Sequence, residues 1–428
     1  MRIHVIGGGT FSPVRNHLAL SSPAFGTTAR YLEKRLVSRL REPDQIDPYR
    51  LDPSFDVLLH LTKMADPASP LVTNDDVSAF LDRLIDDPQT RVIILNAALC
   101  DYDGSIIEAN LPTESGLHAP RLKTAEGGQI MRLTPASKLV GKIRRERKDI
   151  LAVAFKTTTG ATSDEQYAIA LNMLKRDSLN LVLANDTVTR NNMIVAPEET
   201  RYHETPDRNA ALDGLVEMIL ARSRNTFTRS TVVDGDSVSW DDPRIPENLR
   251  TVVNYCIEQG AYKTVRGVTA GHFAVKLDDR TILTSKRKQD FNRLAEIGLV
   301  QVEYEGDDKV VAYGAKPSVG GQSQRIVFRE HPGLDCIVHF HCPLKEEPAD
   351  MVPTVPQWQN ECGSHQCGQN TSRGLKDMSG FGGHLKAVML DGHGPNIVFS
   401  HEVPARDIIA FIEANFDLSQ KTGGLVAA

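Results

Sequence analysis

The sequence is poor in several features that would indicate specialised classes of protein. Six cysteines in 428 residues do not suggest a disulfide scaffold, so we expect reduced thiols and a cytoplasmic location. No apolar run reaches the length of about 18 residues that a membrane-spanning helix needs. The formal net charge of −6 does not favour a nucleic-acid partner, because such proteins usually carry a basic patch or domain. We therefore expect no membrane and no nucleic acid as partners.

The remaining composition is that of an ordinary soluble globular protein, with 40% hydrophobic and 24% charged residues. The length suggests two or three domains. The N-terminal stretch MRIHVIGGGT enters a glycine-rich turn after a short apolar run, so we do not expect a signal peptide. The polar stretch at residues 225–250 is the best candidate for a linker between domains.

The first half of the chain alternates between strand-like and helix-like segments. The β-branched and leucine-rich runs are at 55–62, 91–99, 149–157 and 179–186. The amphipathic runs are at 29–40, 74–87, 163–177 and 210–224, with Asn74 as the expected N-cap of one helix and Ser163 opening another. This alternation predicts a parallel sheet that is covered on both faces by helices.

The second half has a different texture. Helical segments at 247–262, 323–331 and 404–416 flank short strands at 272–279, 281–285, 299–306, 309–314 and 385–399. Turn signals separate these strands. This part predicts an α/β domain with an antiparallel or mixed sheet, and a loop rich in glycine and cysteine at 361–374.

Three glycines at positions 7–9 follow the first strand, where backbone amides could approach a phosphate closely or simply form a turn. The stretch GGTFSPVRNHLALSSPAFGTTA, with the later stretches NAALCDYD, VAFKTTTG and LVLANDTVTRNN, resembles the phosphopantothenoylcysteine synthetases over about residues 1–225. Members of that family use CTP to activate a carboxylate for amide formation. The resemblance implies a Rossmann-like fold and a nucleotide site, with CTP and Mg²⁺ as its ligands. The implied nucleotide-binding residues are Gly8, Gly9, Thr10, Ser21, Ser22, Gly26, Ala97, Asp101 and Asn185.

The first half departs from that family where the chemistry would occur. Ala19 replaces the catalytic asparagine, and alanine offers no hydrogen-bond donor to an acyl-nucleotide intermediate. Pro23 replaces a loop glycine and removes one backbone N–H. The lysine of the family is matched only loosely, by Arg121 or Lys123. The other interpretation of Asp101 is a residue at a strand end that caps a turn.

The stretch CIVHFHCPL places His339 and His341 one residue apart in a strand-like run. Residues i and i+2 of a strand point to the same face, so the two imidazoles are spaced to bind one metal ion. The segments around them resemble the class II aldolase/adducin family over about residues 245–420. That resemblance implies a third ligand, His393 in an HG turn, and a divalent metal, usually Zn²⁺.

The same resemblance implies an anion site and shows departures. Ser318 matches the phosphate-binding serine of the family, and Ser285, Lys286 and Arg287 stand in its phosphate loop, where a solvated basic turn is the alternative. Gly320 replaces the carboxylate that transfers the proton. Two further departures are Gln324, in place of a histidine, and His272, in place of an asparagine.

The loop ECGSHQCGQNTSRG supplies candidates for the missing proton-transfer group. Glu361 and His365 are the residues that we expect to replace it. Cys362, His365 and Cys367 also have a metal-like spacing, but a structural zinc site needs four ligands and no fourth is evident nearby. An active-site loop is therefore the preferred interpretation.

These observations predict an α/β protein of two domains. Residues 1–235 would form a parallel, Rossmann-like nucleotide-binding domain, and residues 236–428 a class II aldolase-like domain. The predicted function is a metal-dependent lyase or epimerase for a small phosphorylated or carboxylated carbonyl compound. The alternatives are a CTP-dependent carboxylate–amine ligase and a non-catalytic, adducin-like scaffold. Both resembled families form oligomers, so we also expect a homo-oligomer, a dimer or tetramer.

Overall fold

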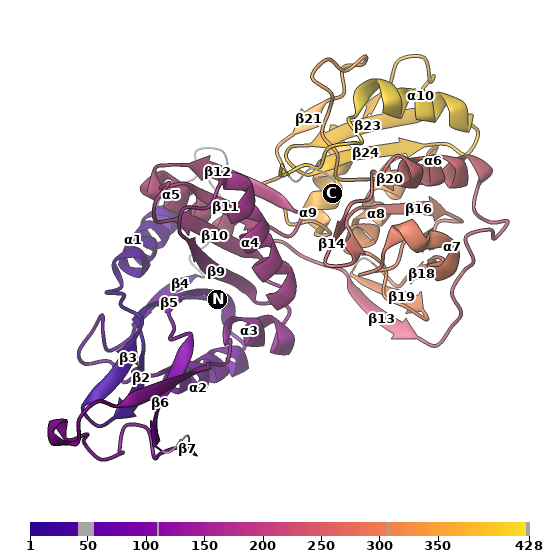
Figure 1. Cartoon of the computed structure of the whole chain (residues 1–428). Helices are drawn as coiled ribbons and strands as arrows, with labels where there is room; N and C mark the ends of the chain where they lie inside the picture. The colour runs from indigo at the N-terminus through magenta and orange to yellow at the C-terminus, as the bar shows by residue number, and fades with distance from the viewer. Residues whose placement is uncertain (42–54, 109–110, 307, 425–428) are drawn as a thin grey trace. The chain divides into compact units, whose positions relative to one another are not determined.

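The computed structural model describes residues 1–41, 55–108, 111–306 and 308–424. The chain forms two compact units (Figure 1). The first contains residues 1–160, 173–194 and 205–223, and the second contains 161–172, 195–204 and the chain from 224 onward. None of the helices in the described part of the chain combines the length and apolar character needed to cross a membrane.

A seven-stranded sheet lies at the centre of the first half of the chain. Its order is β12-β11-β10-β9-β5-β1-β4, and the strands from β10 to β4 are parallel. The strands are β1 Arg2–Gly9, β4 Asp56–Leu61, β5 Thr90–Ala98, β9 Leu151–Thr158, β10 Leu181–Asp186, β11 Asn192–Ala196 and β12 Thr200–Thr205. Central strands such as β5 are continuous buried apolar runs, as expected of parallel strands covered by helices. The predicted fold class is confirmed.

Five helices accompany this sheet in the described part of the first half. They are α1 Thr27–Arg41, α2 Asn74–Asp86, α3 Val140–Glu146, α4 Ser163–Asp177 and α5 Arg208–Arg222. Helix α1 contacts α5, and α2 contacts α3. The predicted cap of α2 is wrong by one residue: Thr73 is the N-cap, its hydroxyl accepts from the backbone of Asp76, and Asn74 is the first helical residue.

The expected glycine-rich turn at residues 7–9 is also wrong. These glycines belong to β1 and pair with residues 96–98 of β5. A Cβ on Gly9 would lie 2.0 Å from the carbonyl oxygen of Ser22. The glycine therefore permits two protein segments to approach each other, which is a packing role rather than a turn.

Two small antiparallel sheets in the first unit were not predicted. One pairs β2 Phe11–Arg15 with β3 Leu18–Ser21, and the other has the order β7-β6-β8. The strands of the second are β6 Tyr102–Glu108, β7 Leu111–Pro112 and β8 Ile130–Pro135, and a short 3-10 helix, Thr124–Glu126, precedes β8. Strand β8 is mostly exposed, so its sequence lacks the buried apolar alternation that identifies a strand.

The second unit contains a ten-stranded mixed sheet, as the sequence predicted. Nine strands follow the order β13-β19-β18-β17-β16-β20-β24-β23-β21, with β22 paired to β23. Pairs β13–β19 and β21–β23 are parallel and the other pairs are antiparallel. The strands are β13 Arg229–Val233, β16 His272–Lys276, β17 Thr281–Thr284, β18 Val300–Tyr304, β19 Lys309–Tyr313, β20 Cys336–His339, β21 Thr354–Val355, β22 Lys376–Asp377, β23 Leu385–Leu390 and β24 Gly394–Phe399. Strand β13 lies inside the expected linker.

The remaining elements of this unit are five helices, a 3-10 turn and a small hairpin. They are α6 Glu247–Glu258, α7 Leu294–Ile297, α8 Val319–Glu330, α9 His365–Gly374, α10 Ala405–Asn415, the 3-10 turn Phe291–Arg293, and β14 Thr264–Val265 paired with β15 Val268–Thr269. Helix α8 begins four residues earlier than the predicted segment at 323–331.

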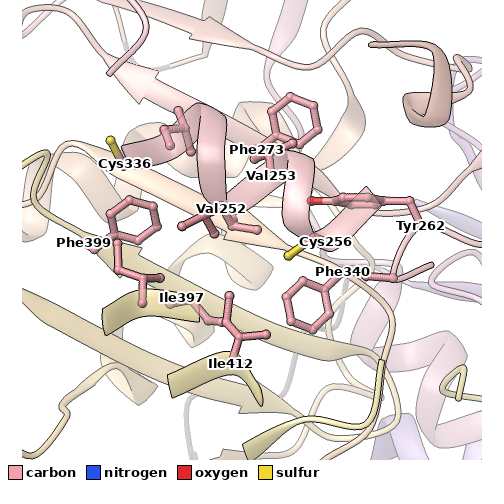
Figure 2. Close-up of a cluster of buried hydrophobic side chains, with 14 of the residues drawn as sticks. Val252, Val253, Cys256, Tyr262, Phe273, Cys336, Phe340, Ile397, Phe399 and Ile412 are labelled. Atoms are coloured by element: carbon pink, nitrogen blue, oxygen red, sulfur yellow. The ribbon is translucent and has the colours of Figure 1, made fainter. Parts of the chain in front are cut away.

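Both faces of the ten-stranded sheet are covered. One face packs against α6 and α10 in a core that includes Val252, Phe273 and Ile412 (Figure 2). The other face packs against α8 and α9 through side chains such as Phe328 and Cys367. Because successive strand residues alternate between faces, His339 lies on the same face as Ile337, the face of α8 and α9.

The loop expected at residues 361–374 is largely a helix. Ser364 is the N-cap of α9, and its hydroxyl accepts a hydrogen bond from the backbone N–H of Cys367. A serine cap satisfies an N–H of the first turn that would otherwise have no partner in the helix. The glycines concealed this helix from the sequence analysis, although Gly368 lets α9 pack closely on Ser323 of α8.

Candidate metal centre

Three histidines from two separate parts of the chain converge in the second unit. His339 ends β20, His341 follows two residues later, and His393 lies in the turn between β23 and β24. The ligand atoms of all three lie within 4.8 Å of one another. Their side chains are only 1%, 6% and 1% exposed, respectively. The predicted convergence is therefore observed.

A glycine in the turn makes this convergence possible. Gly394 has a φ of +149°, and a Cβ on it would lie 2.1 Å from the carbonyl oxygen of Phe340. Phe340 lies between His339 and His341, so the turn that carries His393 touches the chain between the other two histidines. The ring centroid of His393 is 4.6 Å from that of His339 and 4.7 Å from that of His341.

The hydrogen bonds of His339 suit a metal ligand. Its Nδ1 lies 2.7 Å from the carbonyl oxygen of Pro395, which can only accept, so Nδ1 carries the proton. Its unprotonated Nε2 lies 3.2 Å from Nε2 of His393. Two ring nitrogens facing each other at this distance, beside a third imidazole, form a donor set that can hold a divalent ion. Within the described residues, no carboxylate or thiol joins this group.

Burial keeps the imidazole of His339 neutral. Desolvation lowers the pKa of His339 from 6.5 to about 4, although the hydrogen bond to Pro395 acts in the opposite direction. A neutral imidazole is the form that binds a metal ion. His339 can therefore coordinate at neutral pH without first losing a proton.

The low pKa of His339 predicts that the metal-free protein loses stability in acid. The unfolded chain takes up this proton near pH 6.5 and the folded protein only near pH 4, so acid favours unfolding. The contribution is intact above pH 6.5 and should fall by about 3 kcal/mol between pH 6.5 and 4. Urea denaturation across this range measures it. The His339→Gln variant should show a flatter profile, and a profile equal to that of the wild type would contradict the assignment.

The expected anion site lies where β17 ends and α8 begins. Oγ of Ser285 lies 3.3 Å from Oγ of Ser318, and the backbone N–H of Ser318 donates to the carbonyl oxygen of Ser285 at 2.9 Å. Both serines are buried. The ammonium of Lys286 contacts the hydroxyl of Ser237 and the carbonyl oxygen of Ile297, so it is occupied within the protein.

Arg287 and Glu361 lie near each other. Partial burial lowers the pKa of Arg287, while the charges of Glu361 and Cys362 raise it. The carboxylate of Glu361 is buried, and its backbone N–H donates to Asn225 at 2.7 Å. Glu361 thus remains a candidate for proton transfer, and Arg287 is the basic residue of the phosphate loop that lies beside it.

His365 is held by the chain that precedes β13. Its Nε2 lies 2.8 Å from the hydroxyl of Thr228, and its Nδ1 lies 3.3 Å from the hydroxyl of Thr226. In the described chain, Cys362, His365 and Cys367 do not form a metal-binding group. Cys367 instead receives a hydrogen bond from the amide of Gln357, at 3.4 Å.

The predicted nucleotide-binding residues gather at one edge of the parallel sheet in the first unit. Strand β1 ends at Gly9, β5 at Ala98 and β10 at Asp186, so residues at these positions share the carboxyl edge. Ligands of open α/β sheets bind at this edge. Thr10, however, donates to the side chain of Asn74 at 2.7 Å, and Ser22 donates to the carbonyl oxygen of Leu99 at 3.1 Å. These two hydroxyls therefore hold the loops together.

Asp101 has a partner that the sequence analysis missed. Its carboxylate pairs with the ammonium of Lys138, and both side chains are exposed. The family resemblance points to Arg121 or Lys123 for this lysine. Lys138 instead follows β8, whose pairing with β6 brings it back to the start of that strand. Only the unpredicted three-stranded sheet reveals this proximity. Asn185 accepts from the hydroxyl of Thr157 at 3.3 Å.

The part of the chain that contains the three histidines is similar to a known protein family. Residues 250–402 match the family described as the Class II Aldolase and Adducin N-terminal domain. The second unit contains a class II aldolase-like domain. No curated protein matches the chain.

Several solved structures are similar to one half of the chain. The DNA/pantothenate metabolism flavoprotein from Streptococcus pneumoniae is 20% identical, and the match covers 52% of this chain and 98% of that chain with a TM-score of 0.39. YgbL from Escherichia coli, a putative aldolase/epimerase/decarboxylase, is 21% identical over 39% and 84%, with a TM-score of 0.30. An L-fuculose 1-phosphate aldolase is 17% identical over 40% and 82%, with a TM-score of 0.29. At these identities the similarity concerns the fold alone.

The C-terminal segment forms hydrogen bonds with the backbone of two of the three histidines. The backbone N–H of Thr422 donates to the carbonyl oxygen of His341 at 3.0 Å, and its hydroxyl donates to the carbonyl oxygen of His393 at 2.8 Å. Thr422 is buried and thus links two of the three histidine segments. No sequence pattern indicates this link, because Thr422 lies beyond the last predicted helix.

This link predicts the effect of Thr422→Val. The change keeps the size of the side chain and removes the hydroxyl donor, leaving a buried carbonyl oxygen without that bond. We expect a loss of about 1–3 kcal/mol in the free energy of unfolding, measured by urea denaturation. Zinc affinity should also fall several-fold, because the turn of His393 is less firmly held. A Thr422→Ser variant, which retains the hydroxyl, should recover most of the zinc affinity; equal losses in both variants would contradict this role.

Proposed function

We propose that the aldolase-like domain is a metal-dependent lyase or epimerase for a small carbonyl compound bearing a phosphate or carboxylate. The observation that carries this proposal is the convergence of three buried imidazoles on one point. His339, His341 and His393 would hold the ion, with Zn²⁺ as the expected metal. Bound there, zinc would supply a Lewis acid that polarises the carbonyl group of the substrate.

The anion of the substrate would bind beside α8. Ser285 and Ser318 offer hydroxyl groups, and the first backbone N–H groups of α8 carry a partial positive charge. Arg287 adds a full charge near Glu361. Lys286 is excluded from our proposed anion site because Ser237 and Ile297 occupy its ammonium.

Glu361 is the proposed proton-transfer group, in place of the carboxylate that Gly320 removes. Replacing Glu361 with glutamine keeps the size and removes the ionisable group, so turnover should fall by about 10²–10⁴-fold. The zinc content should stay unchanged, because Glu361 does not belong to the histidine group. Turnover equal to that of the wild type would exclude Glu361 as the base.

Metal analysis tests the proposal directly. The purified chain should contain about one divalent ion, lose it to a chelator and regain it on dialysis against zinc. Reloading should raise the melting temperature, because a ligand that binds only the folded state stabilises it. A folded protein that contains no metal and cannot be loaded would refute the proposal.

A second candidate function concerns the first unit. Its predicted nucleotide residues share the carboxyl edge of the sheet, and the Asp101–Lys138 pair lies just after β5. This placement favours a site for CTP with Mg²⁺, as in a carboxylate–amine ligase. Thermal unfolding with CTP, ATP and other nucleotides tests it: CTP should raise the melting temperature, less so in Lys138→Ala. No shift with any nucleotide would leave the fold without this activity.

The third candidate, a non-catalytic scaffold, is disfavoured by the convergence of three buried histidines. We further propose that the protein acts in the cytoplasm as a homo-oligomer with a small-molecule substrate. Light scattering measures the oligomeric state directly, and a monomer at micromolar concentration would contradict that part of the proposal.

A further inference from the structure

Two positions at which the chain departs from the class II aldolase pattern contact each other. His272 begins β16, and Gln324 lies in the second turn of α8. Nε2 of Gln324 lies 2.6 Å from Nδ1 of His272. Both side chains are buried, with 6% and 1% exposure. The two departures therefore form one unit rather than two independent changes.

His272 lies beside the metal centre. It stands directly opposite His339 in the antiparallel pair β16–β20, so the two side chains share a face of the sheet. Their ring centroids are 4.8 Å apart. Strand β16 also lies between β20 and β17, the strand that leads into Ser285. His272 thus stands between the histidine group and the proposed anion site.

The hydrogen bonds of Gln324 define the tautomer of His272. The hydroxyl of Thr284 donates to Oε1 of Gln324 at 3.1 Å, which directs the amide NH₂ group toward His272. Nδ1 of His272 then accepts, so its proton is on Nε2. Among the described residues, Gln324 is the one hydrogen-bond partner of the His272 side chain. The Nε2–H group is therefore left for a ligand.

We propose that His272 is a catalytic residue that donates a hydrogen bond from Nε2 to the oxygen of the substrate that becomes negative during the reaction. Gln324 and Thr284 are positioning residues that fix the donor tautomer. The inference rests on the proposed metal-dependent function. It assigns the developing oxyanion to a neutral imidazole that keeps its proton, since a preorganised donor stabilises negative charge without reorganising.

The tautomer can be measured without a variant or a substrate. Two-bond ¹H–¹⁵N correlations in protein labelled with ¹⁵N-histidine distinguish Nε2–H from Nδ1–H. We expect His272 as the Nε2–H form, and a mixture of tautomers in Gln324→Leu. In the opposite arrangement, the Thr284 hydroxyl would donate to the carbonyl oxygen of Phe273, which lies 3.2 Å away, and Gln324 would be flipped. A signal from Nδ1–H would show that arrangement and overturn the proposal.

A binding measurement tests the donor itself. Glycolohydroxamate, a chelating anion shaped like an enediolate, serves as the probe for the zinc-loaded protein. His272→Phe keeps a ring against His339 and removes the donor, so probe affinity should fall by about 10- to 100-fold, the value of one hydrogen bond to a charged group. His331→Phe, a half-buried histidine at the end of α8, is the matched control and should bind like the wild type.

Zinc content, measured first for each protein, distinguishes a failure of the role of His272 from a failure of the metal-dependent function. Wild type and His272→Phe should bind zinc equally, within about threefold, because His272 is not among the converging ligands. Equal probe affinity in both proteins would overturn the role of His272 while leaving the metal site intact. A wild-type protein that binds no zinc would refute the metal-dependent function, and this proposal with it.

Discussion

Replacing His341 with alanine should lower zinc affinity by about 100- to 1,000-fold, since a four-ligand zinc site has a total binding free energy of about 10–16 kcal/mol. The variant keeps two of the three imidazoles, and two ligands alone do not hold the ion in its tetrahedral geometry. Turnover should fall in parallel, because the carbonyl of the substrate would no longer be polarised. Competition with a chromogenic chelator measures the affinity.

The matched control for this prediction is His384→Ala. His384 is an exposed histidine of the same domain and lies outside the converging group. It should bind zinc like the wild type, and circular dichroism should show that both variants are folded. If His341→Ala retained the zinc affinity of the control, His341 would not be a ligand.

Gly394→Ala should cost about 4 kcal/mol of folding stability, because backbone strain and overpacking each cost about 1–3 kcal/mol. An alanine Cβ would lie 2.1 Å from the carbonyl oxygen of Phe340. Since the obstacle is backbone rather than a flexible side chain, the turn of His393 must move. Zinc affinity should therefore fall together with stability.

Gly333→Ala is the comparison for this effect. No atom lies within 4 Å of the Cβ that it would add, and its φ is not positive. We expect a change in the free energy of unfolding of less than about 0.5 kcal/mol, as for most surface substitutions. Equal destabilisation by the two variants would show that the close approach of Gly394 to Phe340 is not required.

The sequence predicted the parts of the fold that have strong periodicity. Helix α4 occurs at the predicted residues, and β5 differs from its prediction by one residue at each end. Long amphipathic or apolar runs carry this information locally. The error at α9 has a local cause as well: its glycines suggested a loop, while the cap at Ser364 was the signal that could have identified the helix.

Only some contacts of the candidate site could be predicted from the sequence. The spacing of His339 and His341 indicated a pair, although β20 ends at His339 and His341 lies beyond the strand. The third ligand, His393, came only from the family resemblance. The contact between His272 and Gln324 could not be read from the sequence, because it joins a strand to a helix 52 residues later. The two residues appeared there as unrelated departures. Only the fold shows that the side chains of His272 and Gln324 contact each other.

X-ray absorption at the zinc edge tests the central claim most directly. The zinc-loaded protein should show three imidazole nitrogens at about 2.0–2.1 Å, and His393→Ala should remove one of them. This result would show that three histidines from two distant segments of chain meet at one ion. Sulfur ligands at about 2.3 Å, or no loss of imidazole in the variant, would contradict the account.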